Sequence, residues 1–325
     1  MSPRARRHHW KWSLSVVIAA ALLYFSLRGV DWRRVWAVIA AARWQFIAGS
    51  ALAISISSTL RALRWRILLS AGADLSVWTV FRATMAGYLG NNFLPARAGE
   101  LIRSLLISRR SKLSKAYVLT TALSERLMDA IALVLAGSVV LLGVHPKPTW
   151  MSGVARSLAF FAALGAITVT IAPHAGHRFT KLVARLPLPD SLRAKISDLL
   201  EQVLLGMRAF HHWGRFIGFI LLTATIWSCD ACSMMICARA LDLHIAFPLA
   251  LLLLTALGLG SALPSTPGYV GIFQFVAVSV LTPFGIPKNS ALAYILLIQA
   301  LGYVVVVLLG LPSLSLLRET KREVD

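Results

Sequence analysis

The chain is dominated by long apolar runs, and its basic residues lie mostly between them. A helix that spans a membrane needs about 20 mostly apolar residues. Six runs are candidates for full spans, namely residues 13–28, 44–61, 116–143, 154–172, 215–239 and 290–317. This feature predicts an all-α, polytopic integral membrane protein in which residues 1–325 form a single transmembrane domain.

The composition excludes an ordinary soluble protein. Hydrophobic residues make up 58% of the chain and charged residues 14%, whereas soluble domains carry about a quarter charged residues. The formal net charge is +20, from 33 Lys and Arg against 13 Asp and Glu. Because these basic residues lie between apolar runs, we expect anionic membrane lipids as partners and no nucleic acid.

Two further apolar regions, 77–107 and 247–283, are each interrupted by proline and glycine. Proline removes a backbone donor and disturbs the preceding helical turn, and glycine permits sharp reversals. Irregular backbone at membrane depth is tolerated only where protein or a watery cavity satisfies it. We therefore predict two re-entrant helical hairpins, with two kinked helices as the alternative. The interruptions that would form their tips and hinges are Pro95, Gly99, Pro264, Pro267, Gly268 and Gly271.

The two interruptions share the pattern Leu-Pro-x-x-x-Gly, with Gly90 shortly before the first and Gly260 shortly before the second. Paired interruptions in two halves are typical of transporters built from repeats, with the binding site at the repeat interface. We predict a first repeat at about 44–143 and a second at about 215–317.

Lysine and arginine near the span ends predict the topology. They place both termini in the cytoplasm of a cell (inner) membrane protein, with Arg61 and Arg64 at a cytoplasmic span end. The two hairpins then enter from opposite sides, as inverted repeats. Segment 28–43 is placed outside despite its arginines, and its tryptophans indicate an interfacial helix. Segment 190–213 shows helical apolar spacing, which predicts a cytoplasmic amphipathic helix or a packed connector.

The first group of ionisable residues inside a predicted membrane segment is Arg97, Glu100 and Arg103. Such residues are costly there and indicate function. A helix N-terminus and arginine side chains both bind phosphate. We predict a lipid-headgroup site here, with Asn91 and Asn92 binding headgroup hydroxyls. The alternative is an internal salt-bridge cluster.

The second group is Glu125, Arg126 and Asp129. Arg126 and Asp129 are three residues apart and can pair on one helix face. Glu125 lacks a partner on its own helix, so Arg97 or Arg103 is expected to supply one. The alternatives are a buried ion-pair network and a role for Glu125 as a proton carrier.

The third group is Cys229-Asp230-Ala-Cys232. No second cysteine pair or histidine pair accompanies it, so small buried cysteines are favoured over metal or redox chemistry. Asp230 is expected to face a cavity. We expect no metal site and no cofactor.

Three motifs carry a family resemblance. Residues 87–103 read GYLGNNFLPARAGELIR, residues 125–129 read ERLMD, and residues 264–271 read PSTPGYVG. Together they resemble the lysylphosphatidylglycerol synthase transmembrane-region family, also called the flippase-like domain family. The resemblance implies a region that moves an aminoacylated phospholipid between leaflets, while a separate cytoplasmic domain makes that lipid. Other members are linked to glycolipid or polyprenyl-lipid pathways.

Two positions depart from the family pattern. Gln274 stands where a glutamate is usual, and Gln299 stands near the position of a charged residue or histidine in the last span. Both keep a hydrogen-bonding amide without charge, which argues against proton coupling through the second repeat. We expect no aminoacyl-transferring domain after residue 318, and therefore no synthesis of the lipid by this chain.

These features predict a lipid translocase rather than an enzyme. Its substrate would be an anionic phospholipid or a polyprenyl-phosphate-type lipid. The alternative is a membrane partner or scaffold without transport activity, on which a lipid-modifying enzyme encoded elsewhere docks through the basic face of 174–213.

Overall fold

The computed structural model describes residues 23–143 and 210–315, apart from 25, 95–97, 211 and 262–266, together with scattered positions between 153 and 197. These residues form helices and connecting turns, with no strand among them. The predicted spans 13–28 and 154–172 and the predicted helix 190–213 lie largely outside this part of the chain.

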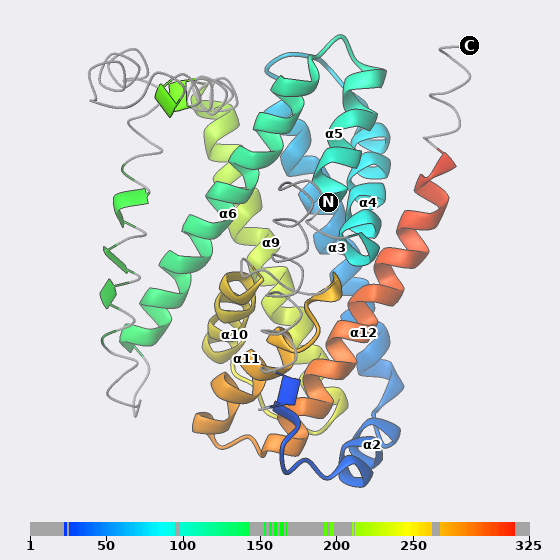
Figure 1. Ribbon diagram of the computed structural model, residues 1–325, viewed down its shortest axis with the longest axis vertical. Coiled ribbons are helices and arrows are strands. Elements are labelled where there is room, and N and C mark those ends of the chain that lie inside the picture. The colour runs from blue at the N-terminus through cyan, green and yellow to red at the C-terminus, as the bar shows by residue number, and fades with distance from the viewer. Residues whose placement is uncertain are drawn as a thin grey trace, which may run out of the picture.

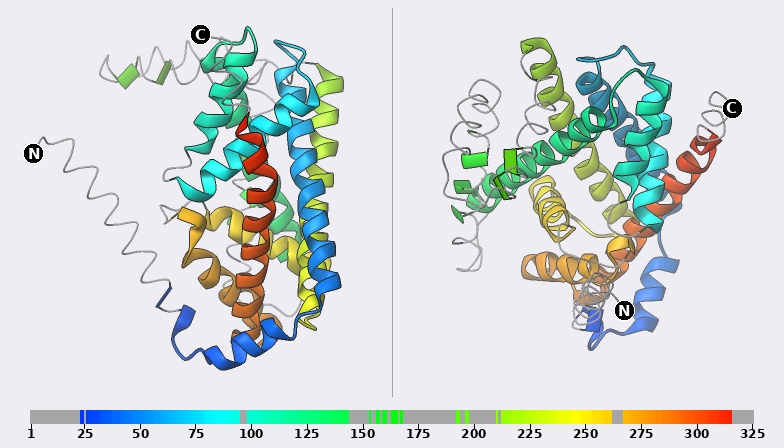
Figure 2. Two further views of the ribbon diagram at one scale, coloured as in Figure 1. Left: turned by 90° about the vertical axis from the view of Figure 1, so that its right-hand side faces the viewer. Right: turned by 45° about the horizontal axis from the view of Figure 1, so that its top comes forward.

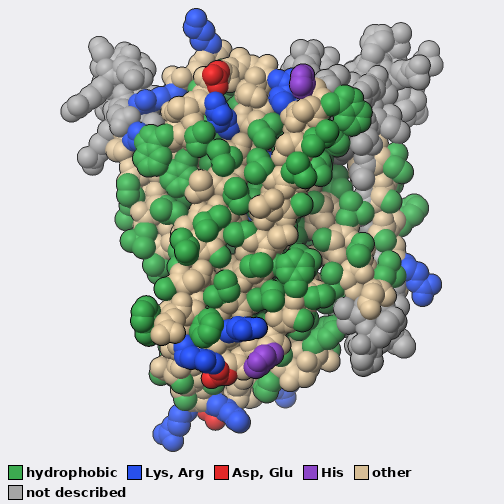
Figure 3. All heavy atoms as spheres, turned by 180° about the vertical axis from the view of Figure 1, so that it is seen from behind, with side chains coloured by type: hydrophobic (Ala, Val, Ile, Leu, Met, Phe, Trp, Pro, Cys, Tyr) green, Lys and Arg blue, Asp and Glu red, His purple; other side chains and the backbone are tan. Residues whose placement is uncertain are grey.

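Four helices are long and apolar enough to cross a membrane: α3 (Trp44–Leu69), α6 (Lys115–Gly143), α9 (Trp213–Ala240) and α12 (Lys288–Ser313). They coincide with four of the predicted spans. On the face seen in Figure 3, apolar side chains cover the middle of the molecule, while lysine and arginine gather mainly toward its two ends. The protein is therefore an all-helical membrane protein, as its composition predicts.

Helix α3 continues beyond the predicted span end at residue 61. Arg64 has no exposed surface and lies inside the helix, followed by the buried Trp65 and Leu68. The predicted span therefore ended too early, and ion pairs described below compensate the charges of Arg61 and Arg64 inside the bundle. Their assignment to the cytoplasmic side stays a prediction.

The first interrupted region forms two helices, α4 (Val77–Phe93) and α5 (Gly99–Arg110), which pack against each other. Ser76 caps α4 by accepting a hydrogen bond from the Thr79 amide at 3.1 Å. A Cβ atom on Gly99 would overlap the carbonyl oxygen of Gly87. The glycines therefore let the two backbones approach closely beside the interruption.

The second interrupted region forms α10 (Phe247–Gly260), the short 3-10 turn η3 (Pro267–Tyr269) and α11 (Ile272–Leu281), which is followed by η4 (Thr282–Phe284). Gly268 and Gly271 have φ angles of +76° and +90°, a backbone region that favours glycine. These two glycines make the turn into α11. Re-entrance of either region into a membrane stays a prediction.

The helices form one bundle with the two short-helix pairs in opposite halves (Figure 1). Helix α3 lies along α9, while α4 packs on α12 and α10 packs on α6. Helix α4 also contacts η3, so the two interrupted regions meet inside the bundle. Figure 2 shows the same arrangement from the side and obliquely.

Helix α2 (Trp32–Ala40) lies across one end of the bundle and packs on α12 (Figure 1). Asp31 caps it by accepting a hydrogen bond from the Arg34 amide at 3.1 Å. Val35 is buried, whereas Trp32 and Trp36 are exposed. This one-sided burial fits the interfacial helix predicted for segment 28–43.

Candidate functional site

Eight charged side chains from four helices form one network inside the bundle. They are Arg61 and Arg64 of α3, Glu100 and Arg103 of α5, Glu125, Arg126 and Asp129 of α6, and Asp230 of α9. Four guanidinium groups thus face four carboxylates. Because buried charge is costly unless it is paired, the network compensates its own charge.

Arg64 lies at the centre of this network, with a side chain that is 0% exposed. Its Nη1 donates to Asp129 Oδ1 at 2.6 Å, and its Nη2 donates to Asp129 Oδ2 at 2.8 Å and to Glu125 Oε1 at 2.9 Å. Nη1 also donates to the Thr223 hydroxyl at 3.0 Å. One side chain therefore connects α3, α6 and α9.

The carboxylates of Glu100 and Glu125 surround Arg103, and the Arg103 side chain is 1% exposed. Its Nε donates to Glu100 Oε2 at 2.6 Å, and its Nη2 lies 3.0 Å from Glu125 Oε2. Its guanidinium also covers the Trp65 ring at 4.4 Å. These contacts fit the internal salt-bridge cluster that was the alternative, while the headgroup site at Arg97, Glu100 and Arg103 stays a prediction, with Arg97 outside the described residues.

Glu125 therefore lies between two guanidinium groups, with a side chain that is 1% exposed. Of its two expected partners, Arg103 is present and Arg97 lies outside the described residues; Arg64 is the partner that the sequence did not indicate. Glu125 has no contact with the cavity described below. Its surroundings fit a buried ion-pair network better than a proton carrier.

Asn91 joins the two helices of the first pair. Helix α5 begins at Gly99 without a side-chain cap of its own, and Asn91 Oδ1 accepts the Gly99 amide hydrogen at 2.9 Å. Its Nδ2 lies 3.4 Å from Glu100 Oε1. Asn91 thus satisfies a helix N-terminus from the neighbouring helix, away from the cavity, and Pro95 lies outside the described residues.

In the second helix pair, α10 and α11, hydrogen bonds between uncharged groups connect the turn before α11 to helix α12. Gln274 Oε1 accepts from the Gly271 amide at 2.7 Å, and Gln274 Nε2 donates to Gln299 Oε1 at 2.8 Å. Gln299 Nε2 and Tyr303 Oη both donate to the Gly268 carbonyl at 2.6 Å. The two glutamines singled out in the sequence are therefore directly bonded, and they fasten this turn to α12. Pro264 lies outside the described residues.

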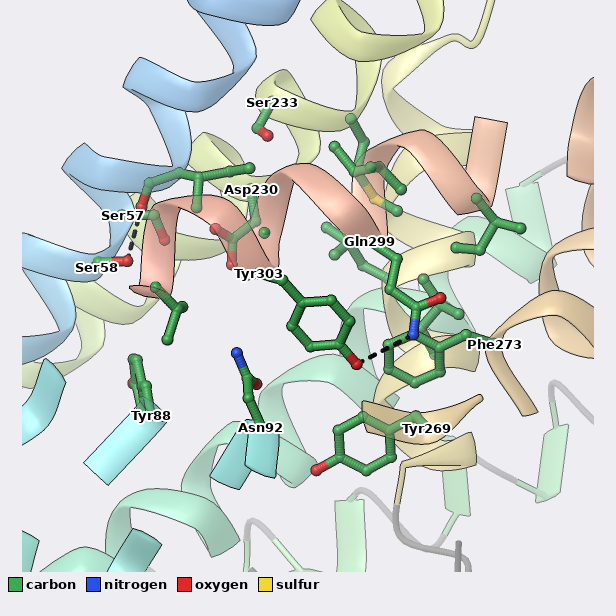
Figure 4. Close-up of a pocket in the computed structure, with 18 of the residues that line it drawn as sticks. Ser57, Ser58, Tyr88, Asn92, Asp230, Ser233, Tyr269, Phe273, Gln299 and Tyr303 are labelled. Carbon is green, nitrogen blue, oxygen red and sulfur yellow. Dashed lines mark hydrogen bonds between the residues drawn. The ribbon is translucent and has the colours of Figure 1, made fainter. Parts of the chain in front are cut away.

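A cavity of about 330 Å³ lies where the two interrupted regions meet α3, α9 and α12 (Figure 4). Its polar lining comprises Ser57, Ser58, Arg61, Tyr88, Asn92, Asp230, Ser233, Tyr269, Gln299 and Tyr303. Its apolar lining comprises Ile54, Met234, Leu254, Leu257, Phe273, Ile295, Ile298 and Val306. Apolar walls with a few polar groups are typical of small-molecule sites.

Arg61 and Asp230 form an ion pair in the cavity wall. Their side chains are 14% and 17% exposed, and Arg61 Nη1 lies 4.0 Å from Asp129 Oδ2, which links the cavity to the network. Asp230 faces a cavity, as predicted. Arg61 was assigned only to topology and was not predicted to line the site; the signal that could have indicated it is a pair of arginines three residues apart in an apolar run that continues to Leu69.

The cysteines of α9 are free. Cys237 is buried, Cys229 is half-buried and Cys232 is exposed. The prediction of small buried cysteines concerned Cys229 and Cys232; it is wrong for Cys232, and Cys229 is only partly buried.

The family model described as the lysylphosphatidylglycerol synthase TM region matches residues 12–310. The chain belongs to this family. The match covers the charged network, the cavity and both interrupted regions. It also establishes the family that the three sequence motifs indicated.

Two curated relatives show how far this family member resembles known proteins. Glycosyltransferase AglD of Haloferax volcanii is 24% identical over 336 residues, covering 93% of this chain and 53% of the relative. The UPF0104 membrane protein MJ1078 of Methanocaldococcus jannaschii is 21% identical over 238 residues, covering 72% of this chain and 98% of the relative. The chain thus spans about half the length of AglD.

Proposed function

We propose that this family member moves an anionic phospholipid or a polyprenyl-phosphate-type lipid between the leaflets of the cell membrane. The observation that carries the proposal is the cavity, which places the Arg61 guanidinium among apolar walls where the interrupted regions meet. A lipid headgroup needs a polar site at membrane depth, since charge is costly in the hydrocarbon core. Its acyl or polyprenyl chain can remain outside among lipids.

We further infer that α3–α6 and α9–α12 are two inverted repeats. Each half has a long, a short, a short and a long helix, of 26, 17, 12 and 29 residues in the first and 28, 14, 10 and 26 in the second. The packing also exchanges between halves, because α4 contacts α12 and α10 contacts α6. Repeat-built transporters bind substrate at such an interface, which is where the cavity lies.

In this proposal Arg61 binds the headgroup phosphate, since a guanidinium matches phosphate geometry. Asn92 of α4 and Gln299 of α12, which both line the cavity, add hydrogen bonds. Arg103 and Glu100 act as positioning residues that hold α5 against α6.

The test is a reconstituted transport assay. Purified protein in liposomes should speed the loss of fluorescence when dithionite bleaches lipids with an NBD-labelled acyl chain, such as phosphatidylglycerol. Arg61→Gln should lower this rate severalfold. Arg109→Gln, at an exposed position at the end of α5, is the matched control. Equal rates for protein-free and protein-containing liposomes would reject the proposal.

One observation favours a second candidate, a membrane partner for a lipid-modifying enzyme. The relative AglD is named a glycosyltransferase, and about half of its length lies outside the match to this chain. A partner encoded elsewhere would supply what that half supplies in AglD. Copurification of a soluble transferase, without lipid movement by the isolated chain, would favour this candidate.

A further inference from the structure

Two polar groups that line the cavity have no hydrogen-bond partner among the residues that the structure describes. They are the Ser57 hydroxyl, on a residue that is 2% exposed, and the Asn92 Nδ2 amide. Buried polar groups in proteins are almost always bonded, and a missing partner costs free energy. Both groups therefore indicate a ligand that offers hydrogen-bonding oxygen atoms at this wall.

The charges of the cavity wall disfavour a doubly charged headgroup. Arg61 is already paired with Asp230 and lies 4.0 Å from Asp129. A phosphate monoester with two negative charges would bring excess charge beside the Asp230 carboxylate, and like charges repel. A phosphodiester, with a single negative charge, meets the same guanidinium with less repulsion.

The Arg61–Asp230 pair retains capacity for neutral hydroxyl groups. A guanidinium carries five N–H donors, and a carboxylate has about four acceptor positions. The structure joins these two groups by a single hydrogen bond, from Arg61 Nη2 to Asp230 Oδ2. A hydroxyl both donates and accepts, so vicinal hydroxyls can bind the remaining positions on both side chains at once.

The rest of the polar lining is uncharged and partly aromatic. Tyr269 and Phe273 stack with ring centroids 4.9 Å apart and an interplanar angle of 10°, and both line the cavity. In Figure 4 the Asn92 amide points into the space beside Tyr88 and Tyr303. Hydroxyls, amides and flat rings together suit a ring that carries several hydroxyl groups on an apolar carbon frame.

We propose that the cavity recognises a polyhydroxylated ring headgroup, of the sugar or cyclitol type, joined to its lipid through a phosphodiester. The inference rests on the proposed function and names the headgroup class of the same site. Arg61 binds the phosphodiester, and Ser57, Asn92 and Asp230 bind ring hydroxyls.

The test compares two lipids of equal charge that differ in hydroxyl groups. Liposomes containing the protein receive either NBD-phosphatidylinositol or NBD-phosphatidylethanol with the same acyl chains. Phosphatidylinositol should move faster by about tenfold or more, because a site built to bind hydroxyls rejects an analogue that lacks them.

Two variants connect this preference to the cavity. Ser57→Ala and Asn92→Ala should each lower the phosphatidylinositol rate more than the phosphatidylethanol rate, and so reduce the preference between the two lipids. Ser55→Ala is the matched control, because the Ser55 hydroxyl bonds the Ala51 carbonyl of its own helix and does not line the cavity. Ser57→Ala should also keep the wild-type melting temperature, since its hydroxyl has no partner to lose within the described part of the chain.

The outcomes separate the two proposals. Equal movement of both lipids overturns hydroxyl recognition and leaves lipid transport standing. A preference for phosphatidylinositol that survives both substitutions overturns the assignment to this cavity. Movement of neither lipid, together with immobile phosphatidylglycerol in the same liposomes, overturns the inference and the proposed function together.

Discussion

Arg64 of α3 and Asp129 of α6 are joined inside the bundle by two hydrogen bonds, one from each terminal guanidinium nitrogen to a different carboxylate oxygen, of 2.6 Å and 2.8 Å. This two-bond geometry is the strongest that an arginine and a carboxylate form. The Arg64 side chain has no exposed surface, so water cannot replace either bond. The pair therefore fixes the relative position of two membrane-crossing helices.

Replacing Arg64 should destabilise the protein strongly. Arg64→Leu leaves Asp129 without its two-bond partner and Glu125 with one guanidinium fewer, and breaking a buried pair in this way costs about 3–5 kcal/mol. Arg64→Lys should lie between this variant and the wild type, because an ammonium cannot form the two parallel bonds. The measurement is thermal or denaturant unfolding in detergent, with Arg109→Leu as an exposed control. If Arg64→Leu unfolds like the wild type, the charged network does not contribute to the stability of the fold.

Gly268 should be far less replaceable than Gly285, although both have positive φ angles, of +76° and +83°. A Cβ atom at Gly285 meets nothing within 4 Å, whereas one at Gly268 would overlap the Tyr303 hydroxyl. Gly285→Ala therefore measures the backbone strain alone, about 1–2 kcal/mol. Gly268→Ala should cost more and should also slow lipid movement.

A double variant separates the two causes at Gly268. Tyr303→Phe removes the atom that the new Cβ would overlap, so it should recover part of the stability lost in Gly268→Ala. Melting temperatures of the four proteins measure the coupling. Equal losses in Gly268→Ala and Gly285→Ala would contradict the packing shown here.

Much of the fold follows from the sequence because hydrophobic length and backbone chemistry are local properties. The predicted spans 44–61, 116–143 and 215–239 lie within helices, and α12 covers residues 290–313 of the predicted span 290–317. A proline lies between α4 and α5, and prolines and glycines lie between α10 and α11. The end of α3 could not be predicted in this way. Arg61 and Arg64 resemble span-end charges until their carboxylate partners are known, and those partners lie 61 to 169 residues away in the chain.

The candidate site was only partly predictable for the same reason. Asp230, Asn92 and Gln299 were singled out and do line the cavity. Arg103 and Asn91 were singled out as headgroup contacts, yet their hydrogen bonds go to Glu100 and Gly99 within the same helix pair. The sequence shows which ionisable residues lie in apolar segments, where their burial is costly. Whether such a residue pairs with a ligand or with another protein group depends on the packing of the helices.

Helices α3 and α9 should be linkable by a disulfide without loss of transport. The Ser50 hydroxyl lies 3.1 Å from the Ser233 hydroxyl, and both residues are buried. With the native Cys229, Cys232 and Cys237 replaced by serine, Ser50→Cys and Ser233→Cys together should oxidise readily. A gel shift after cleavage between the helices, reversed by reductant, detects the bond.

The transport rate of the linked protein then tests which parts move. Helices α3 and α9 pack along each other, and the proposed function does not require them to separate, so oxidation should leave lipid movement nearly unchanged. Each single cysteine variant serves as the control. A rate that falls on oxidation and returns on reduction would show that α3 and α9 must separate.

Single and double substitutions of Arg61 and Asp230 can separate the effect of this ion pair on stability from its effect on transport. Arg61→Gln leaves the Asp230 carboxylate without its guanidinium, and Asp230→Asn leaves Arg61 with only the Asp129 carboxylate, 4.0 Å away. Each variant should cost up to about 3 kcal/mol. The double variant removes both charges and leaves two amides that can bond each other, so most of that stability should return. Transport of phosphatidylglycerol should not return, since the proposed phosphate ligand is gone.

The exposed pair Arg43–Asp242 provides the matched control, because it also joins the end regions of α3 and α9 but lies at the surface, with side chains 54% and 75% exposed. Surface pairs contribute little to stability, so Arg43→Gln with Asp242→Asn should change neither unfolding nor transport. The decisive comparison is between the two double variants. If the Arg61 and Asp230 double variant is stable and still moves lipid at the wild-type rate, this ion pair is structural, and the headgroup must bind elsewhere in the chain.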